Sequence, residues 1–149
     1  MKPDSSYTVP HIIDGVPLVS SDSFAVVNPA TGEKLWSASN ASTETVAAAT
    51  TAYPAWRALG ATARGDLLLA AAAQLEKATP ELVEAMMLET AADENWCLFN
   101  IANSLEMLRG VAGRLPAAVE GRLPVTRDPN TTALIVKEPY GVVLSIAPW

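Results

Sequence analysis

The fold is decided by the almost entirely apolar run Gly141-Val142-Val143-Leu144-Ser145-Ile146-Ala147-Pro148-Trp149. Such a run is typical of a strand that is buried on both faces, and strands of that kind belong inside parallel sheets. A parallel neighbour needs a crossover of a dozen or more residues, usually a helix, so we expect the other strands to be encoded further along. Ligands of open α/β sheets bind at the carboxyl ends of the strands. The run therefore predicts the front part of a larger α/β enzyme, with Ala147 close to its active site.

The charge balance argues against several functional classes. The 149 residues include 10 basic and 16 acidic side chains, for a net charge of −6. That sign repels phosphate backbones, and no run of Lys or Arg offsets it, so no nucleic-acid partner is expected. One cysteine and one histidine cannot build a disulfide framework or a zinc cluster. The amino terminus lacks the apolar core of a signal peptide, and no stretch reaches the length of about 18 apolar residues typical of a membrane helix. We expect a cytoplasmic protein with no metal site and no membrane partner.

Short strands and turns are predicted from Val9 to Trp36, as a small β-meander. Asp14-Gly15 is a hairpin signal, because both residues tolerate the positive φ that two-residue hairpin turns require. The stretch 28–32, Asn-Pro-Ala-Thr-Gly, marks a second turn.

A helical layer is predicted from Ser42 to Leu115. Ser42 is the expected N-cap of a first helix, which carries Val46, Ala49, Tyr53 and Trp56 on one face and is expected to kink or break at Pro54. A second helix is expected from Ala63 to Lys77 with Thr62 as its cap. A third starts with Thr79 as N-cap and ends near Thr90. The fourth carries an apolar stripe that Pro116 closes, formed by Leu98, Ile101, Ala102, Leu105, Leu108, Ala112 and Leu115.

Beyond Gly121 the sequence becomes extended again. Residues 123–126 and 131–137 predict two strands, with the turn Asp128-Pro129-Asn130 between them. Pro139 and Gly141 then redirect the chain into the apolar run. We therefore divide residues 1–149 into amino-terminal strands and helices (9–121), a hairpin (122–138) and the first strand of a sheet (139–149).

These residues resemble the amino-terminal part of the aldehyde dehydrogenase superfamily. The resemblance rests on five segments in a fixed order, which are Phe24–Glu33, Tyr53–Trp56, the helix opened by Arg64, Glu89-Thr90, and Glu138–Trp149. Each is weak alone, since Asn-Pro-x-x-Gly is a common turn, but the order and spacing agree over almost the whole chain. The sequence departs from the family at Glu89-Thr90-Ala91-Ala92, where the family often has Glu-x-Gly-Lys.

The resemblance implies an activity, a cofactor and partners for the complete protein. These are NAD- or NADP-dependent oxidation of an aldehyde to a carboxylic acid through a cysteine thiohemiacetal, a Rossmann-like dinucleotide domain, and a homo-oligomer that the hairpin helps to form. The covalent route divides one difficult oxidation into two easier steps. The family's nucleophilic cysteine and its glutamate lie later in the chain, so we expect no catalytic residue here and no activity from this chain alone. Ile146, Ala147, Pro148 and Trp149 match the segment that lines the cofactor cleft.

Other readings of single residues are less favoured. Cys97 lies in a helical stretch with no basic neighbour in sequence, which favours a buried, inert thiol over a nucleophile. His11 has no partner at ligand spacing. The acids Glu76, Glu81, Glu84 and Glu89 are better explained as solvent-facing helix residues than as a glycosidase pair. One alternative from another class remains open: a truncated, non-catalytic paralogue that pairs with full-length subunits through its hairpin.

Overall fold

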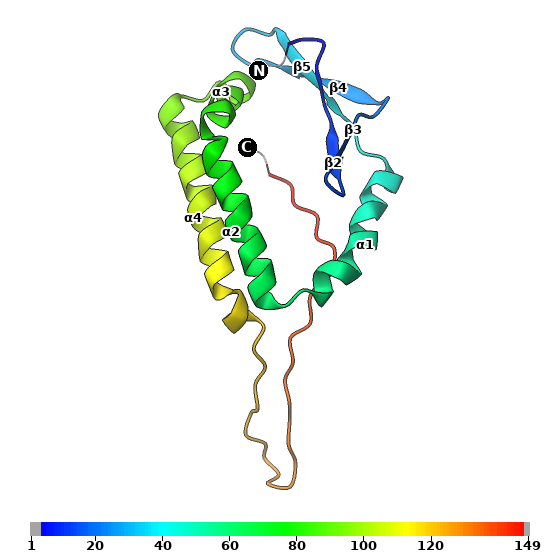
Figure 1. Cartoon of the computed structure of the whole chain (residues 1–149), viewed down its shortest axis with the longest axis vertical. Coiled ribbons are helices and arrows are strands. Elements are labelled where there is room, and N and C mark those ends of the chain that lie inside the picture. The colour runs from blue at the N-terminus through cyan, green and yellow to red at the C-terminus, as the bar shows by residue number, and fades with distance from the viewer. Residues whose placement is uncertain (1–3, 148–149) are drawn as a thin grey trace.

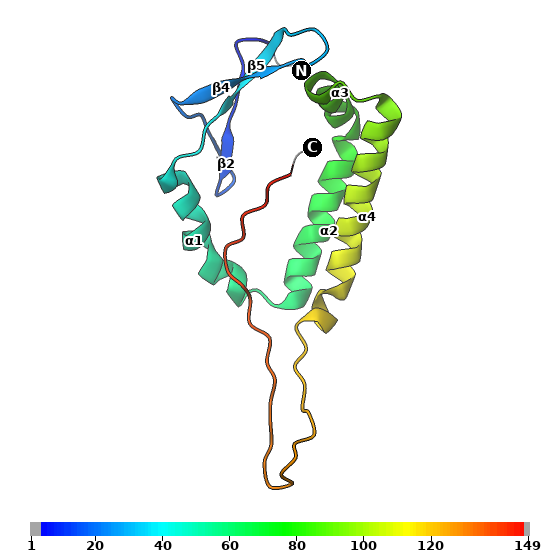
Figure 2. The ribbon, with the colours of Figure 1, turned by 180° about the vertical axis from the view of Figure 1, so that it is seen from behind.

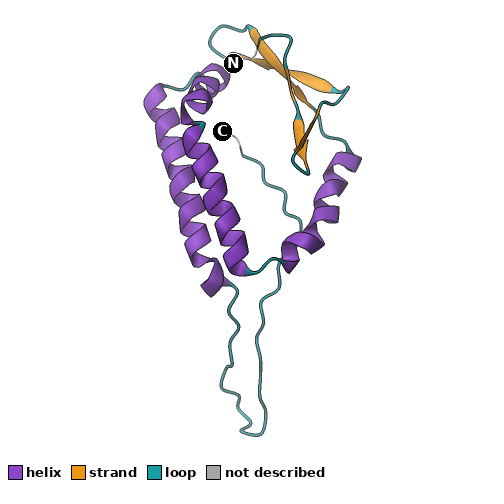
Figure 3. Ribbon diagram, viewed as in Figure 1, coloured by secondary structure: helices purple, strands orange, loops and turns teal. Residues whose placement is uncertain are grey.

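The computed structural model describes residues 4–147, whose strands and helices form two blocks. One block holds β1 (Thr8–Val9), β2 (His11–Ile13), β3 (Val16–Leu18), β4 (Ser23–Val27) and β5 (Lys34–Ser39). The other holds α2 (Ala61–Lys77), α3 (Thr79–Thr90) and α4 (Glu94–Ala118), and α1 (Thr43–Ala58) connects the two. Figure 1 and Figure 3 show α2 and α4 side by side with α3 at their upper ends, while α1 lies on the opposite side of the molecule.

The strands form two small sheets and not the predicted meander. β2 and β3 make an antiparallel hairpin, while the other sheet has the order β1-β5-β4. In that sheet β1 runs parallel to β5, pairing Thr8 with Ser37. The meander prediction is wrong because it assumed that consecutive strands are neighbours, whereas the first strand pairs with the last.

Both predicted turns are confirmed. Asp14 and Gly15 have φ of 51° and 76° and join Ile13 to its partner Val16. Between β4 and β5, the Asn28 side chain accepts a hydrogen bond from the Ala30 N–H at 2.8 Å, and Gly32 has φ of 75°. Local turn chemistry therefore fixes both connections.

The four helices form where the sequence predicts them, but their ends differ and the predicted apolar stripe of α4 is only partly buried, since Leu98 is 42% exposed and Ala102 is also exposed. Ser42 caps α1 by accepting a hydrogen bond from the Thr45 N–H at 3.2 Å. The break expected near Tyr53 does not occur, because α1 continues through Pro54 to Ala58. In the same way α4 continues past Pro116 to Ala118.

The starts of α2 and α3 also differ by one or two residues from the prediction. α2 begins at Ala61 with Gly60 as N-cap, in place of Thr62. The N-cap of α3 is Ala78, and Thr79 is already helical, with its hydroxyl donating to the Leu75 carbonyl oxygen at 3.3 Å. Asp93, an exposed residue, caps α4 by accepting from the Trp96 N–H at 3.0 Å.

The hydrophobic core lies among α2, α3 and α4. Its buried members are Ala72, Val83, Cys97, Ile101 and Leu105. At the other end of the α2–α4 contact, a Cβ added to Gly65 would stand 3.1 Å from the Ala112 carbonyl oxygen. The two helices approach this closely because position 65 has no side chain.

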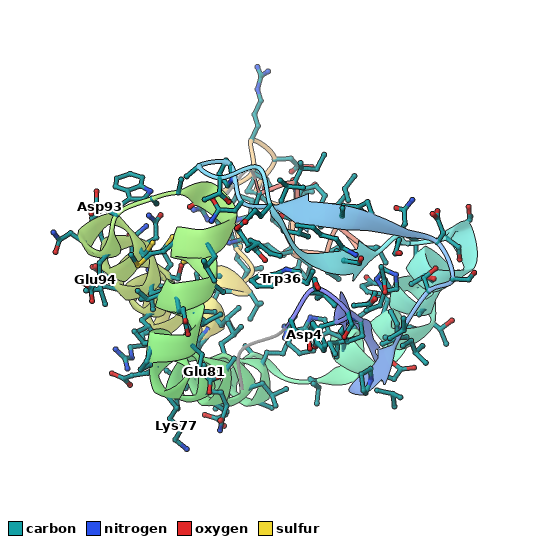
Figure 4. The ribbon with its side chains drawn as sticks, turned by 90° about the horizontal axis from the view of Figure 1, so that it is seen from above. Asp4, Trp36, Lys77, Glu81, Asp93 and Glu94 are labelled. Atoms are coloured by element: carbon teal, nitrogen blue, oxygen red, sulfur yellow. The ribbon has the colours of Figure 1, made fainter. Side chains whose placement is uncertain are left out.

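Trp36 links the sheet to the helical block. Its side chain is only 4% exposed, and its indole N–H donates to the Glu89 carboxylate at 2.9 Å. Figure 4 shows Trp36 between the strands and the helices. Glu89 is therefore not simply a solvent-facing acid, as its helical position predicted, because it accepts a hydrogen bond from the other block. Glu76, by contrast, pairs with Arg109 at the surface.

The predicted hairpin forms a long arm, which we define as residues 122–138 (Figure 1). A single antiparallel bridge, Arg122 to Ile135, pairs its two sides within the described residues. At its tip, the Asp128 carboxylate accepts from the Asn130 N–H at 2.9 Å and from the Thr131 hydroxyl at 3.0 Å. These hydrogen bonds, first the one from the Asn130 backbone, lower the pKa of Asp128. The turn is as predicted, while the two flanking strands are reduced to one bridge.

The left-handed conformation of Ala91 should lower the stability of the helical block. Ala91 ends α3 with φ of 55°, a left-handed conformation that costs a residue with a Cβ about 1–2 kcal/mol. We expect Ala91→Gly to raise the free energy of unfolding by about 0.5–1 kcal/mol in urea denaturation. Ala73→Gly, at an exposed position inside α2, is the control and should lower it by a similar amount. A loss of stability in Ala91→Gly would contradict the assignment.

The Trp36–Glu89 hydrogen bond should contribute to stability beyond the packing of the ring. Trp36→Phe keeps an aromatic ring but removes the donor to Glu89, an exposed carboxylate, so we expect a loss of about 0.5–1.5 kcal/mol in the free energy of unfolding. Trp56→Phe is the matched control, because Trp56 is 44% exposed and should cost little. Equal losses in the two variants would show that the hydrogen bond is not responsible.

Candidate functional site

Residues 139–147 form the part of the chain to which the sequence assigned the site, and we call them the apolar segment. The two opposite views in Figure 1 and Figure 2 show it running from the base of the arm, past α1, toward the sheet block. Gly141, with φ of 97°, turns the chain near the start of this segment. A residue with a Cβ rarely adopts that conformation, so the turn depends on glycine.

The apolar segment is extended but is not a strand in the described residues. Leu144 and Ile146 are 83% and 84% exposed. The prediction that the partners of this run are not among the residues before it agrees with this exposure, because residues 4–147 supply no strand beside it; that the run becomes a buried strand stays a prediction. The apolar side chains are left uncovered.

One groove lies beside the middle of the segment. Its volume is about 430 Å³, and it is bounded by β2, α1 and the segment. The lining is almost wholly apolar and consists of Ile12, Ile13, Asp14, Thr45, Val46, Ala48, Ala49, Ala52, Val142, Val143 and Leu144. The predicted apolar face of α1 thus faces this groove at Val46 and Ala49, although no core covers it.

A second groove lies where the segment reaches the sheet block. It has a volume of about 680 Å³ and contains Ala147 together with residues of β1, β4, β5, α3 and the start of α4. Its polar groups come from Glu89 and Thr90 at the end of α3. Trp96 also lines it and stacks on Phe99, with ring centroids 5.6 Å apart. The Glu89 side chain thus lines the second groove and also accepts the hydrogen bond from the Trp36 indole.

The four predicted cofactor-binding residues are only partly visible. Ile146 is exposed and Ala147 lines the second groove. Pro148 and Trp149 lie outside the described residues. The structure therefore brings Ala147 to an apolar groove, but it does not test what binds there.

Comparison with known proteins identifies the family. Residues 18–149 match the Aldehyde dehydrogenase family. This chain belongs to the aldehyde dehydrogenase family. It is 39% identical to vanillin dehydrogenase of Pseudomonas fluorescens over 147 residues, covering 95% of this chain and 30% of that protein. It is 31% identical to salicylaldehyde dehydrogenase of Pseudomonas putida, covering 87% of this chain and 28% of that protein.

Solved structures of the aldehyde dehydrogenase family agree with the fold. A salicylaldehyde dehydrogenase from Pseudomonas putida G7, complexed with salicylaldehyde, has a TM-score of 0.78 at 25% identity and covers 89% of this chain and 28% of that one. A putative methylmalonate-semialdehyde dehydrogenase from Sinorhizobium meliloti, complexed with NAD, has a TM-score of 0.80 at 25% identity, covering 91% and 29%. The chain spans about 30% of the length of such aldehyde dehydrogenases, at their amino-terminal side.

The single cysteine of this aldehyde dehydrogenase chain is not placed for catalysis. Cys97 has 0% exposure and packs in the helical core with Val83 and Ile101. The predicted burial of Cys97 is confirmed, and its inertness stays a prediction. His11 lies in β2, and its Nε2 atom is buried without a hydrogen-bond partner. In residues 4–147 no helix is long and apolar enough to cross a membrane, and no cluster of three potential metal ligands occurs.

Sequence reasoning missed the polar contacts that hold these parts together. They are Trp36 to Glu89, Arg57 to Glu138 at 3.0 Å, and Lys137 to the Ala118 carbonyl oxygen at 2.9 Å. The partners stand 53, 81 and 19 residues apart, so periodicity cannot reveal them. The only available signal was the position of Glu89 and Glu138 inside the motifs that resemble the family.

The exposed apolar segment should govern the solubility of the isolated chain. Exposed apolar side chains on an unpaired extended backbone favour intermolecular association. We expect Leu144→Lys combined with Ile146→Lys to lower light scattering of the purified chain at rising concentration. Leu67→Lys combined with Leu69→Lys, which changes two exposed leucines of α2, should have much less effect. A similar decrease in both variants would contradict a special role of the segment.

Proposed function

We propose that this chain is the amino-terminal part of an NAD- or NADP-dependent enzyme that oxidises an aldehyde to a carboxylic acid. The observation that carries the proposal is the family match over residues 18–149, which ends in an apolar segment left without strand partners. Among the related structures, one is described as complexed with NAD and another with salicylaldehyde. A Rossmann-like sheet built beyond residue 149 would supply those partners.

Within the proposed enzyme, Ile146, Ala147, Pro148 and Trp149 form one wall of the cofactor cleft. Ile146 and Ala147 fit an apolar wall, since the former is exposed and the latter lines a groove. The sequence contains no Gly-x-Gly-x-x-Gly turn to hold phosphates, so the chain offers only this wall. When bound, NAD or NADP would accept hydride, and the wall residues would orient the cofactor by contact.

The proposed substrate class is an aromatic aldehyde. The support comes from vanillin dehydrogenase at 39% identity and salicylaldehyde dehydrogenase at 31% identity, each matched over most of this chain. The oxidation would proceed through a thiohemiacetal on a cysteine outside these residues, because Cys97 is fully buried in the helical core.

A second candidate function is a non-catalytic interaction module. It is favoured by the apolar side chains of the arm, since Val125 is fully exposed and Leu123 and Leu134 are largely so. In this second candidate function the arm pairs with a complete subunit, whereas in the proposed enzyme it contributes to a homo-oligomer. Co-purification of the 149-residue chain with a complete subunit, compared with a chain lacking residues 123–134, tests this candidate.

The proposed activity requires a nucleophilic cysteine other than Cys97. The complete protein that contains this chain should reduce NAD or NADP with vanillin or salicylaldehyde, followed as absorbance of the reduced nicotinamide. The isolated 149-residue chain should show no turnover. Cys97→Ser in the complete protein should keep kcat close to that of the unchanged enzyme, because a buried structural thiol takes no part in the chemistry.

Three results would contradict the proposal. These are turnover by the isolated chain, loss of activity in Cys97→Ser with an unchanged unfolding transition, and no reduction of either nicotinamide by the complete protein with any aldehyde. A preference for betaine aldehyde over vanillin would contradict the aromatic substrate class alone.

A further inference from the structure

Two neighbouring residues at the base of the arm contact different helices. The Glu138 carboxylate accepts a hydrogen bond at 3.0 Å from the guanidinium of Arg57, which lies in the last turn of α1. The Lys137 ammonium donates to the Ala118 carbonyl oxygen at 2.9 Å, at the end of α4. Successive side chains of an extended backbone point to opposite sides. Lys137 and Glu138 thereby connect the ends of two helices on either side of the chain.

These contacts are the last polar ones before the apolar segment. The backbone bridge between Arg122 and Ile135 lies just before them, and the turn at Gly141 just after. In the described part of the chain, no backbone hydrogen bond between main-chain groups holds residues 138–147. Pro139 follows directly and fixes its own φ, so the direction set at Glu138 is carried forward.

The two contacts suit positioning better than global stability. The Arg57 and Glu138 side chains are 53% and 69% exposed, and exposed ion pairs contribute little to the unfolding equilibrium. Lys137 satisfies a carbonyl at a helix carboxyl terminus, where a cation also interacts favourably with the helix dipole. Both contacts act on one short stretch, and that stretch determines where the apolar segment starts.

We propose that Arg57, Lys137 and Glu138 form a junction that positions the apolar segment, and with it the cofactor wall at Ile146 and Ala147. This inference rests on the proposed function for its second half, since the wall is assigned to the cofactor only there. The three residues are positioning residues and touch neither cofactor nor substrate. Reversing the charge of either Arg57 or Glu138 alone should loosen the segment, and exchanging the two residues in a double variant should restore it.

The first test measures the segment itself, without any ligand. Hydrogen–deuterium exchange of the complete protein, read by mass spectrometry on a peptide covering residues 139–147, reports its local order. We expect faster exchange in Arg57→Glu and in Glu138→Arg, and a return toward the unchanged rate in the double variant that exchanges the charges. Lys137→Met should also speed exchange, and Lys137→Arg should not.

A matched control separates this junction from surface charge in general. Arg109 and Glu76 form an ion pair at 2.7 Å with similar exposure, 49% and 59%, but they join α4 to α2 away from the segment. Arg109→Glu should leave exchange of peptide 139–147 unchanged. Equal acceleration in Arg109→Glu, or no restoration in the charge-exchanged double variant, would overturn the proposal.

The second test measures the cofactor. We expect the Kd for NAD to rise about two- to fivefold in Arg57→Glu and in Glu138→Arg and to recover in the double variant, a range set by the usual strength of exposed ion pairs. KM for the aldehyde should change less than the Kd for NAD. If exchange responds as expected while the unchanged protein binds neither NAD nor NADP, the junction stands and the proposed function fails. If NAD binds normally and exchange does not respond, the junction fails alone.

Discussion

The close packing of α2 against α4 supports the rest of the structure. The helices can approach only because Gly65 has no side chain where the Ala112 carbonyl oxygen lies, and their contact encloses most of the buried core together with α3. The arm begins where α4 ends, and α1 ends just before α2 begins. If α2 and α4 were displaced from each other, Arg57 and Ala118 would separate, and the contacts of Glu138 and Lys137 would be lost together.

The sheet block depends on the helical block through a much smaller contact. Trp36 is the only strand residue in the described chain that is fully buried, and Glu89 holds its indole from the end of α3. That end is itself conformationally costly, because Ala91 takes a left-handed φ that glycine would take more easily. The departure from the family's Glu-x-Gly-Lys pattern therefore falls two residues after the carboxylate that joins the blocks. Alanine at position 91 takes this left-handed conformation at a higher cost than glycine would.

Sequence reasoning succeeded where structure depends on neighbours in sequence. The turns at Asp14-Gly15 and Asn28–Gly32, the cap at Ser42 and the buried positions Ile101, Leu105 and Ala112 of α4 all follow from local propensity and periodicity. It failed where structure depends on distant partners. The parallel pairing of β1 with β5 was one such case, and the Trp36–Glu89 hydrogen bond was another. The apolar segment marks the limit of such reasoning: its composition predicts burial, and whether it becomes a strand depends on partners that residues 4–147 do not provide.

The arrangement of these parts indicates what this portion of an aldehyde dehydrogenase contributes. Cys97 is buried in the helical core, Asp14 and Glu89 each line one of the two grooves beside the apolar segment, and the Glu89 carboxylate is already engaged by Trp36. The described residues also include the two contacts that set the direction of the chain at the base of the arm. The arm and the apolar segment are continuous through Lys137 and Glu138, so the same two side chains orient both. If the arm contacts another subunit and the segment forms a cofactor wall, as proposed, both are attached to one pair of helix ends, and a change in the angle between α1 and α4 would act on both at once.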